Sequence, residues 1–176
     1  MYKAVIIDDE IWTRDVIKSL GDWAALNLTV VGEAEDGETG LALIHNVSPD
    51  VIVTDVRMPR LNGIKLVEQL RAEQIDTPVL MVSGYDDFEY VRSALKLGVT
   101  DYLLKPIKPK ELNQQLKVCV ERAASARQKD GGGFLAEHWL GQYESLLKRI
   151  STALHLGRNE LLQKEFLSME ETMVSN

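Results

Sequence analysis

The sequence IIDDE at residues 6–10 decides the fold, because an apolar run ends there in two adjacent aspartates. Three later stretches repeat the pattern: VTD ends at Asp55, MVS ends at Ser83, and YLLK ends at Lys105. In an open parallel sheet the carboxyl ends of the strands lie along one edge, where ligands bind. The pattern therefore predicts that these polar side chains converge at one edge of a parallel sheet.

The converging groups suit a divalent cation and a phosphoryl group. Asp8, Asp9 and Asp55 supply three carboxylates, Ser83 a hydroxyl, and Lys105 an ammonium group. Mg²⁺ prefers one or two carboxylates together with water and phosphate oxygens, and a lysine ammonium is a compact charge for phosphate. Taken singly, each residue could be a helix cap, a turn residue or a surface lysine. Their joint position at strand ends favours a functional site.

Strand and helix patterns alternate through the first three quarters of the chain. This alternation implies parallel strands with helices on both faces of one sheet, an α/β fold. We expect strands over 3–8, 28–34, 51–54, 79–82 and 99–103, and helices over 10–20, 38–46, 64–73, 87–96 and 109–127. The positions expected to face the core include Ile11, Val16, Ile17 and Leu20 in the first helix and Leu41 and Ile44 in the second.

Composition excludes several classes of protein. The single cysteine, Cys119, rules out an internal disulfide and fits a reducing compartment. No apolar run is long enough to span a membrane and no signal-peptide pattern is present, so we expect a cytoplasmic protein without a membrane partner. The net charge of −7 argues against non-specific nucleic-acid binding, which needs an excess of Lys and Arg.

The character of the chain changes after residue 128. We expect one domain over 1–128, and the three glycines within 129–133 predict a flexible linker. Apolar residues at helical spacing in 134–176 predict two helices that need other surfaces to cover them, as in a linker or dimerisation segment. This segment carries more acidic than basic side chains, which is unlike a DNA-binding surface.

Residues 1–128 resemble the receiver domain of bacterial two-component response regulators, a flavodoxin-like, doubly wound fold with a five-stranded parallel sheet. The stretches 83–90 and 101–106 are similar to the subgroup with a C-terminal AraC-type DNA-binding domain. The residues after Gly133 are too few for such a domain, so we expect a truncated regulator that contacts DNA only through a domain missing from this chain. The residues that carry the resemblance are Asp8, Asp9, Asp55, Met58-Pro59, Gly63, Ser83, Tyr102 and Lys105-Pro106.

This resemblance implies a role for each polar residue. Asp55 accepts a phosphoryl group from a sensor histidine kinase. Asp9, Asp55 and the backbone carbonyl of Arg57 bind Mg²⁺, and Asp8 acts mainly through water. Lys105 pairs with a phosphoryl oxygen.

Two further residues are implied in signalling. Ser83 donates a hydrogen bond to the phosphoryl group and, with Tyr102, forms a switch. The switch changes the face made by 87–96, 99–103 and 109–127, a face expected to form a homodimer. The bond that precedes Pro106 is expected to be cis. The expected output is control of transcription, by a protein that catalyses only its own phosphorylation and dephosphorylation.

Two alternatives stay open. A metal-dependent phosphohydrolase of the haloacid dehalogenase type could use the same carboxylates. Such enzymes carry a second aspartate two positions after the nucleophile, where this chain has Arg57, which cannot relay a proton. The second alternative is a regulator whose output is protein–protein contact without DNA binding.

Overall fold

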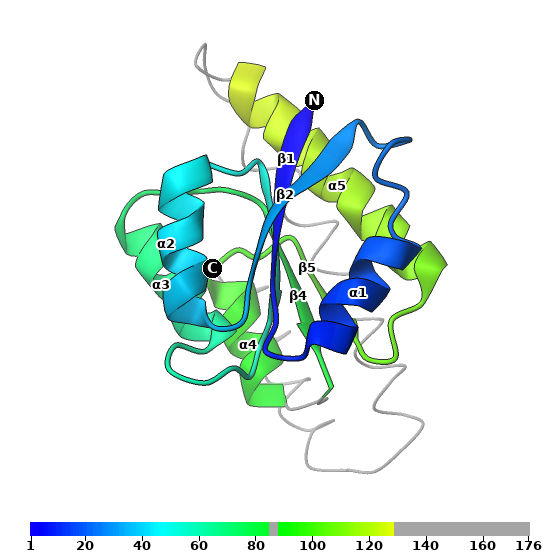
Figure 1. Ribbon diagram of the computed structural model, residues 1–176. Helices are drawn as coiled ribbons and strands as arrows, with labels where there is room; N and C mark the ends of the chain where they lie inside the picture. Colours follow the sequence, from blue (N-terminus) through cyan, green and yellow to red (C-terminus); the bar gives the residue numbers. More distant parts are fainter. Residues whose placement is uncertain (85–87, 129–176) are drawn as a thin grey trace, which may run out of the picture. The chain divides into compact units, whose positions relative to one another are not determined.

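The structure is a computed structural model and describes residues 1–84 and 88–128. Strands and helices alternate along these residues, as the sequence predicts (Figure 1). The strands are β1 (Tyr2–Ile7), β2 (Leu28–Ala34), β3 (Val51–Asp55), β4 (Val79–Ser83) and β5 (Asp101–Leu104). The helices are α1 (Ile11–Leu20), α2 (Gly37–Val47), α3 (Gly63–Ala72), α4 (Phe88–Lys96) and α5 (Pro109–Gln128).

The five strands form one parallel sheet in the order β2-β1-β3-β4-β5. Helices α1 and α5 cover one face of the sheet, and α2, α3 and α4 cover the other (Figure 1). The order reverses direction at β1, so β1 and β3 lie side by side in the middle of the sheet. The predicted α/β, doubly wound, five-stranded fold is confirmed, and its carboxyl edge brings the ends of β1, β3, β4 and β5 together.

Both faces of the sheet are buried, which explains why its strands are nearly continuous apolar runs. On the side of α1 and α5, alternate strand residues such as Ile6 and Val53 pack against Leu112 and Leu116 of α5. Cys119 belongs to this core and is completely buried, and this desolvation raises the pKa of its thiol to about 12. The thiol is a small apolar packing group in the folded protein.

The boundary of β5 differs from the prediction. The strand begins at Asp101, two residues later than expected, because the turn that ends α4 extends to Val99. Gly98 has the positive φ of 67° that commonly ends a helix, and the Val99 amide still donates to the carbonyl of Ala94. The remaining elements start and end within one or two residues of their predicted positions.

The inward face of α1 was predicted incorrectly at two positions. Ile17 is buried and Leu20 is half-buried, but Ile11 and Val16 are exposed. With 3.6 residues per turn, Ile11 and Val16 lie roughly 100° or more to either side of Ile17 around the helix. They flank the stripe that meets the sheet and α5. In α2, Ile44 is buried as predicted and Leu41 is only half-buried.

Gly63 holds the loop after β3 in place. Its amide donates to the carbonyl oxygen of Val56 at 3.0 Å, and Asn62 caps α3 by accepting a hydrogen bond from the Lys65 amide. A Cβ atom at Gly63 would overlap the carbonyl oxygen of Asp55, a backbone atom that no side-chain rotation can move away. Glycine is therefore required where α3 approaches the end of β3.

The predicted linker over 129–133 and the two helices predicted within 134–176 lie outside the described residues. Among the helices of the described ranges, none combines the length and the apolar character needed to cross a membrane.

The Gly63 packing makes a direct prediction. Gly63→Ala should destabilise the fold by about 1–3 kcal/mol, the usual cost of overpacking, although alanine favours a helix over glycine elsewhere. The measurement is urea unfolding followed by circular dichroism. Gly84→Ala is the matched control, because among the described residues the nearest side-chain atom to a Cβ there, Cδ of Lys105, is 3.9 Å away. Equal stabilities for the two variants would contradict this account.

A carboxylate cluster at the carboxyl edge of the sheet

The chain places its acidic residues where the central strands end. Asp8 directly follows β1, and Asp55 is the last residue of the neighbouring β3. Apolar residues fill the strands before them, so both side chains emerge at the edge of the core and are almost completely buried. Asp9 follows Asp8 and is exposed. We call Asp8, Asp9 and Asp55 the carboxylate cluster.

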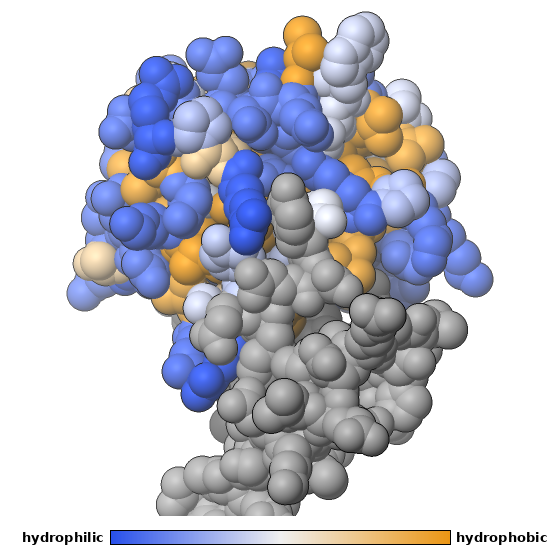
Figure 2. Space-filling view, turned by 90° about the horizontal axis from the view of Figure 1, so that it is seen from below, coloured by the Kyte–Doolittle hydropathy of each residue, from blue (hydrophilic) through white to orange (hydrophobic). Residues whose placement is uncertain are grey.

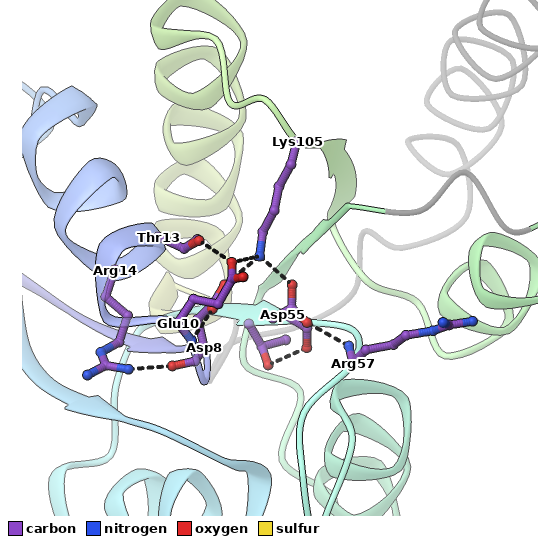
Figure 3. A network of polar contacts seen from close by, with 8 residues as sticks. Asp8, Glu10, Thr13, Arg14, Asp55, Arg57 and Lys105 are labelled. Atoms are coloured by element: carbon purple, nitrogen blue, oxygen red, sulfur yellow. Dashed lines mark hydrogen bonds and ion pairs between the residues drawn. The ribbon is translucent and has the colours of Figure 1, made fainter.

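Lys105 reaches this cluster from the other side of the edge, after β5 (Figure 3). Its Nζ lies 2.9 Å from Oδ1 of Asp55 and 3.1 Å from Oδ2 of Asp8. The Lys105 amide also donates to the carbonyl oxygen of Ser83 at 2.7 Å, which fixes the backbone from which the side chain projects. The peptide bond between Lys105 and Pro106 is cis. One ammonium group thus joins the two buried carboxylates.

The second oxygen of Asp55 is held by the chain that follows it. The amide of Arg57 donates to Oδ2 of Asp55 at 2.7 Å, so the two carboxylate oxygens face different partners. The Asp8 carboxylate is arranged similarly: its Oδ1 accepts a hydrogen bond of 2.9 Å from the Glu10 amide. Local backbone donors therefore orient both carboxylates before any ligand arrives.

Burial dominates the electrostatics of the two buried acids. Desolvation raises the pKa of Asp8 and of Asp55, although backbone donors and Lys105 oppose the shift. The charge of Asp55 raises the pKa of Asp8 further, and the charge of Asp9 does the same to Asp55. Burial also disfavours the Lys105 ammonium, but its hydrogen bonds and charge interactions with Asp55 and Asp8 outweigh burial and raise its pKa.

These directions have a consequence for stability. A carboxyl group with a raised pKa stabilises the fold fully below its unfolded pKa, near 3.8. That stability is lost as the pH rises through the folded-state pKa. At neutral pH the ionised carboxylates of Asp8 and Asp55 therefore cost the fold free energy, and a further cation would offset that cost.

Ser83 and Tyr102 lie close to this edge. Ser83 ends β4 and is buried, and Tyr102 lies in β5 and is buried as well. In the sheet, Ser83 is paired with Leu104 and Tyr102 is paired with Met81. Of the predicted site residues, the structure thus brings Asp8, Asp55 and Lys105 into direct contact and puts Ser83 at the same edge.

Glu10 is a member of the site that the sequence interpretation missed. Its Oε2 lies 3.4 Å from Nζ of Lys105 and accepts a hydrogen bond of 2.8 Å from the Thr13 hydroxyl (Figure 3). The Thr13 hydrogen bond and the Lys105 charge lower the pKa of Glu10. In the sequence, the position of Glu10 directly after the paired aspartates indicates that it lies near the site.

The donor set fits Mg²⁺ on chemical grounds. Within the described residues, no three His, Cys, Asp or Glu side chains are already grouped as a metal cage. Mg²⁺ does not need such a cage, because it keeps several waters and binds one or two carboxylates. Three carboxylates, those of Asp8, Glu10 and Asp55, contact the single ammonium group of Lys105. Desolvation of the buried pair raises the pKa values of Asp8 and Asp55, so a cation would stabilise their ionised forms.

Comparison with known proteins agrees with this geometry. The family model described as the response regulator receiver domain matches residues 4–117. An uncharacterized response regulatory protein from Staphylococcus epidermidis is 38% identical over 122 residues, which are 69% of this chain and 48% of that protein. The transcriptional regulatory protein HptR of Staphylococcus aureus is 34% identical over 148 residues, 84% of this chain and 57% of that protein.

Solved structures give the same result. The REC domain of AraT, a response regulator from Geobacillus stearothermophilus, is 36% identical and superposes with a TM-score of 0.65, over 72% of this chain and 98% of that one. A two component transcriptional regulator AraC from Clostridium phytofermentans is 33% identical with a TM-score of 0.64, over 73% of this chain and 99% of that one.

The predicted resemblance, including the AraC-type neighbour, is therefore confirmed. The chain spans about half the length of the curated relatives that it matches. The matched residues 4–117 include most of β1, the whole of β2, β3, β4 and β5, and the carboxylate cluster with Lys105, and the chain belongs to the response regulator receiver family.

Proposed function

We propose that this chain accepts one phosphoryl group on Asp55, with bound Mg²⁺, and that it thereby controls a transcriptional output. The observation that carries the proposal is the arrangement around Asp55, a buried carboxylate with Lys105 on one oxygen and the Arg57 amide on the other. The names of the relatives support a regulatory output, and the family supports phosphorylation.

In the proposed reaction, one carboxylate oxygen of Asp55 attacks the phosphorus of the donor. A new P–O bond forms as the bond from phosphorus to the leaving group breaks, and the leaving group departs with that electron pair. Lys105 pairs with an oxygen of the transferred group, and the Ser83 hydroxyl donates to another. The Arg57 amide orients the carboxylate.

We assign the metal site to Asp9, Asp55 and the backbone carbonyl of Arg57, with Asp8 acting through water. Bound Mg²⁺ would supply positive charge to the oxygens of the phosphoryl group. The surplus of carboxylates over ammonium groups in the cluster supports this assignment. The raised pKa values of Asp8 and Asp55 support it too, since desolvation disfavours their ionised forms and a cation that binds there would offset that cost.

The phosphoryl donor is expected to be a sensor histidine kinase, which must contact the surface beside Asp55. Helix α1 begins there and carries three exposed apolar side chains, Ile11, Trp12 and Val16, of which Trp12 is 78% exposed. Figure 2 views the end of the molecule where β1 finishes and shows hydrophobic side chains among hydrophilic ones on this side. We propose that this part of α1 contacts the kinase.

The phosphoacceptor is tested with a small donor. Acetyl phosphate and Mg²⁺ should add one phosphoryl group to the native chain, measured by intact mass, and Asp55→Asn should abolish the addition. Asp15→Asn, which changes an exposed aspartate of α1, is the matched control and should be labelled normally. Sustained turnover of phosphate esters would instead support the phosphohydrolase alternative.

The metal site is tested by thermal unfolding. Mg²⁺ at about 100 times its dissociation constant should stabilise the native chain by about 2.7 kcal/mol, a Tm rise of several degrees. The rise should be small in Asp9→Asn and normal in Asp15→Asn. It should also decline as the pH falls through the raised pKa values of Asp8 and Asp55, which lie above 3.8, because protonated carboxyls do not bind the metal. An unchanged rise in Asp9→Asn would exclude this ligand assignment.

The kinase contact is tested by comparing two donors. Trp12→Ala should slow phosphoryl transfer from the cognate kinase about fivefold or more, since truncation of an aromatic contact commonly costs over about 1 kcal/mol. Labelling by acetyl phosphate should not change, because Trp12 is outside the reacting groups. Val31→Ala removes an exposed apolar side chain from β2 and serves as the control. If the native chain, Trp12→Ala and Val31→Ala accepted the phosphoryl group from the kinase at equal rates, the proposed contact between Trp12 of α1 and the kinase would be wrong.

A further inference from the structure

Arg57 links Asp55 to helix α4. Its amide donates to Oδ2 of Asp55 at 2.7 Å, while its guanidinium carbon lies 5.0 Å from the centre of the Tyr90 ring. Tyr90 belongs to the first half of α4 and is half-buried. The distance is within the range of a cation–π interaction. A single residue therefore contacts the proposed phosphoacceptor through its backbone and α4 through its side chain.

The side chain of Arg57 points away from the carboxylate cluster. In Figure 3 it extends away from Lys105, Asp8 and Asp55, although it starts only two residues beyond Asp55. The negative charge of the cluster would attract a guanidinium group. The contact with Tyr90 supplies a favourable alternative position for this cation.

The two ends of α4 are attached differently. At the C-terminal end, Nε of Arg71 donates to the carbonyl oxygen of Leu97 at 3.1 Å and Nη2 donates to that of Thr77 at 3.2 Å. Arg71 is half-buried, and desolvation lowers its pKa. The first half of α4 packs in the core through Val91 and has, at Tyr90, a contact with Arg57, whose side chain is exposed. An exposed cation–π contact is more easily exchanged than hydrogen bonds sheltered from water.

A phosphoryl group on Asp55 would compete for the Arg57 guanidinium. Hydrogen bonds between a guanidinium and phosphate oxygens are charge-assisted and can be bidentate, and they are stronger than a cation–π contact at an exposed site. The flexible arginine side chain starts close enough to Asp55 to make the exchange without a large backbone movement. The exchange would remove the Arg57 contact from the first half of α4, while Arg71 would still bind the carbonyl oxygen of Leu97 just after the helix.

We propose that Tyr90 is a positioning residue that holds the Arg57 guanidinium away from Asp55, and that phosphorylation moves this guanidinium to the phosphoryl group and so removes its contact with the first half of α4. The inference rests on the proposed role of Asp55. It makes Tyr90 an element of the unphosphorylated state, so removal of its ring should favour the phosphorylated state.

The experiment measures the binding of beryllium fluoride, a phosphoryl mimic, in the presence of Mg²⁺. The full chain is titrated, and the backbone amide signal of residue 57 is followed by NMR. Tyr90→Leu and Tyr90→Met should bind about two- to fivefold more tightly than the native chain, the factor that corresponds to a cation–π contact of about 0.5–1 kcal/mol. Tyr90→Phe keeps the ring and should bind as the native chain does.

A double-mutant cycle tests whether the effect passes through Arg57. In an Arg57→Gln background, Tyr90→Leu should leave the affinity unchanged, because no guanidinium remains to be held. Unchanged or weaker binding by both Tyr90→Leu and Tyr90→Met in the native background would overturn the inference. An equal gain with and without Arg57 would overturn it as well, since that result indicates a packing effect.

Failure of the proposed function would be recognised separately. Asp55→Asn should lose binding of beryllium fluoride. If Asp55→Asn bound the mimic as tightly as the native chain, the role of Asp55 itself would be wrong. If Asp55→Asn lost binding but the Tyr90 variants matched the native chain, only the role of Tyr90 would be wrong.

Discussion

One ammonium group between two buried carboxylates is the interaction on which the site depends. Lys105 contacts Asp8 and Asp55 at the same time. The three residues lie at the carboxyl ends of β5, β1 and β3, respectively, and the strand order of the sheet determines how far apart these ends are. Burial keeps the pKa values of Asp8 and Asp55 raised although Lys105 contacts both carboxylates. Additional positive charge beside them would therefore be favourable. Lys105 makes burial of the two carboxylates compatible with a stable fold, and a cation bound beside them would stabilise the folded protein further.

The fold and the central site residues were predictable because they follow from strand topology. A parallel sheet has only one carboxyl edge, so polar residues at the ends of successive strands must meet there. The pattern could not distinguish the two sides of α1, because apolar residues occur on its exposed flanks as well as on its buried stripe. Ile11 and Val16 were misassigned for this reason, and both are exposed.

Contacts between distant side chains were beyond the reach of the sequence pattern. Neither Arg57 nor Tyr90 indicates by its type or spacing that the guanidinium rests on that ring. The contacts of Glu10 with Lys105 and Thr13 also depend on rotamers that only the folded chain defines.

The buried thiol of Cys119 gives this protein an internal reporter of its own opening. It is the chain's single cysteine, it packs in the core beside Leu116, and its pKa of about 12 keeps it protonated at neutral pH. Thiol reagents attack the thiolate, so reaction requires an opening of the fold that exposes Cys119 to solvent. The rate of alkylation consequently reports how readily the core around Cys119 opens. No label has to be introduced.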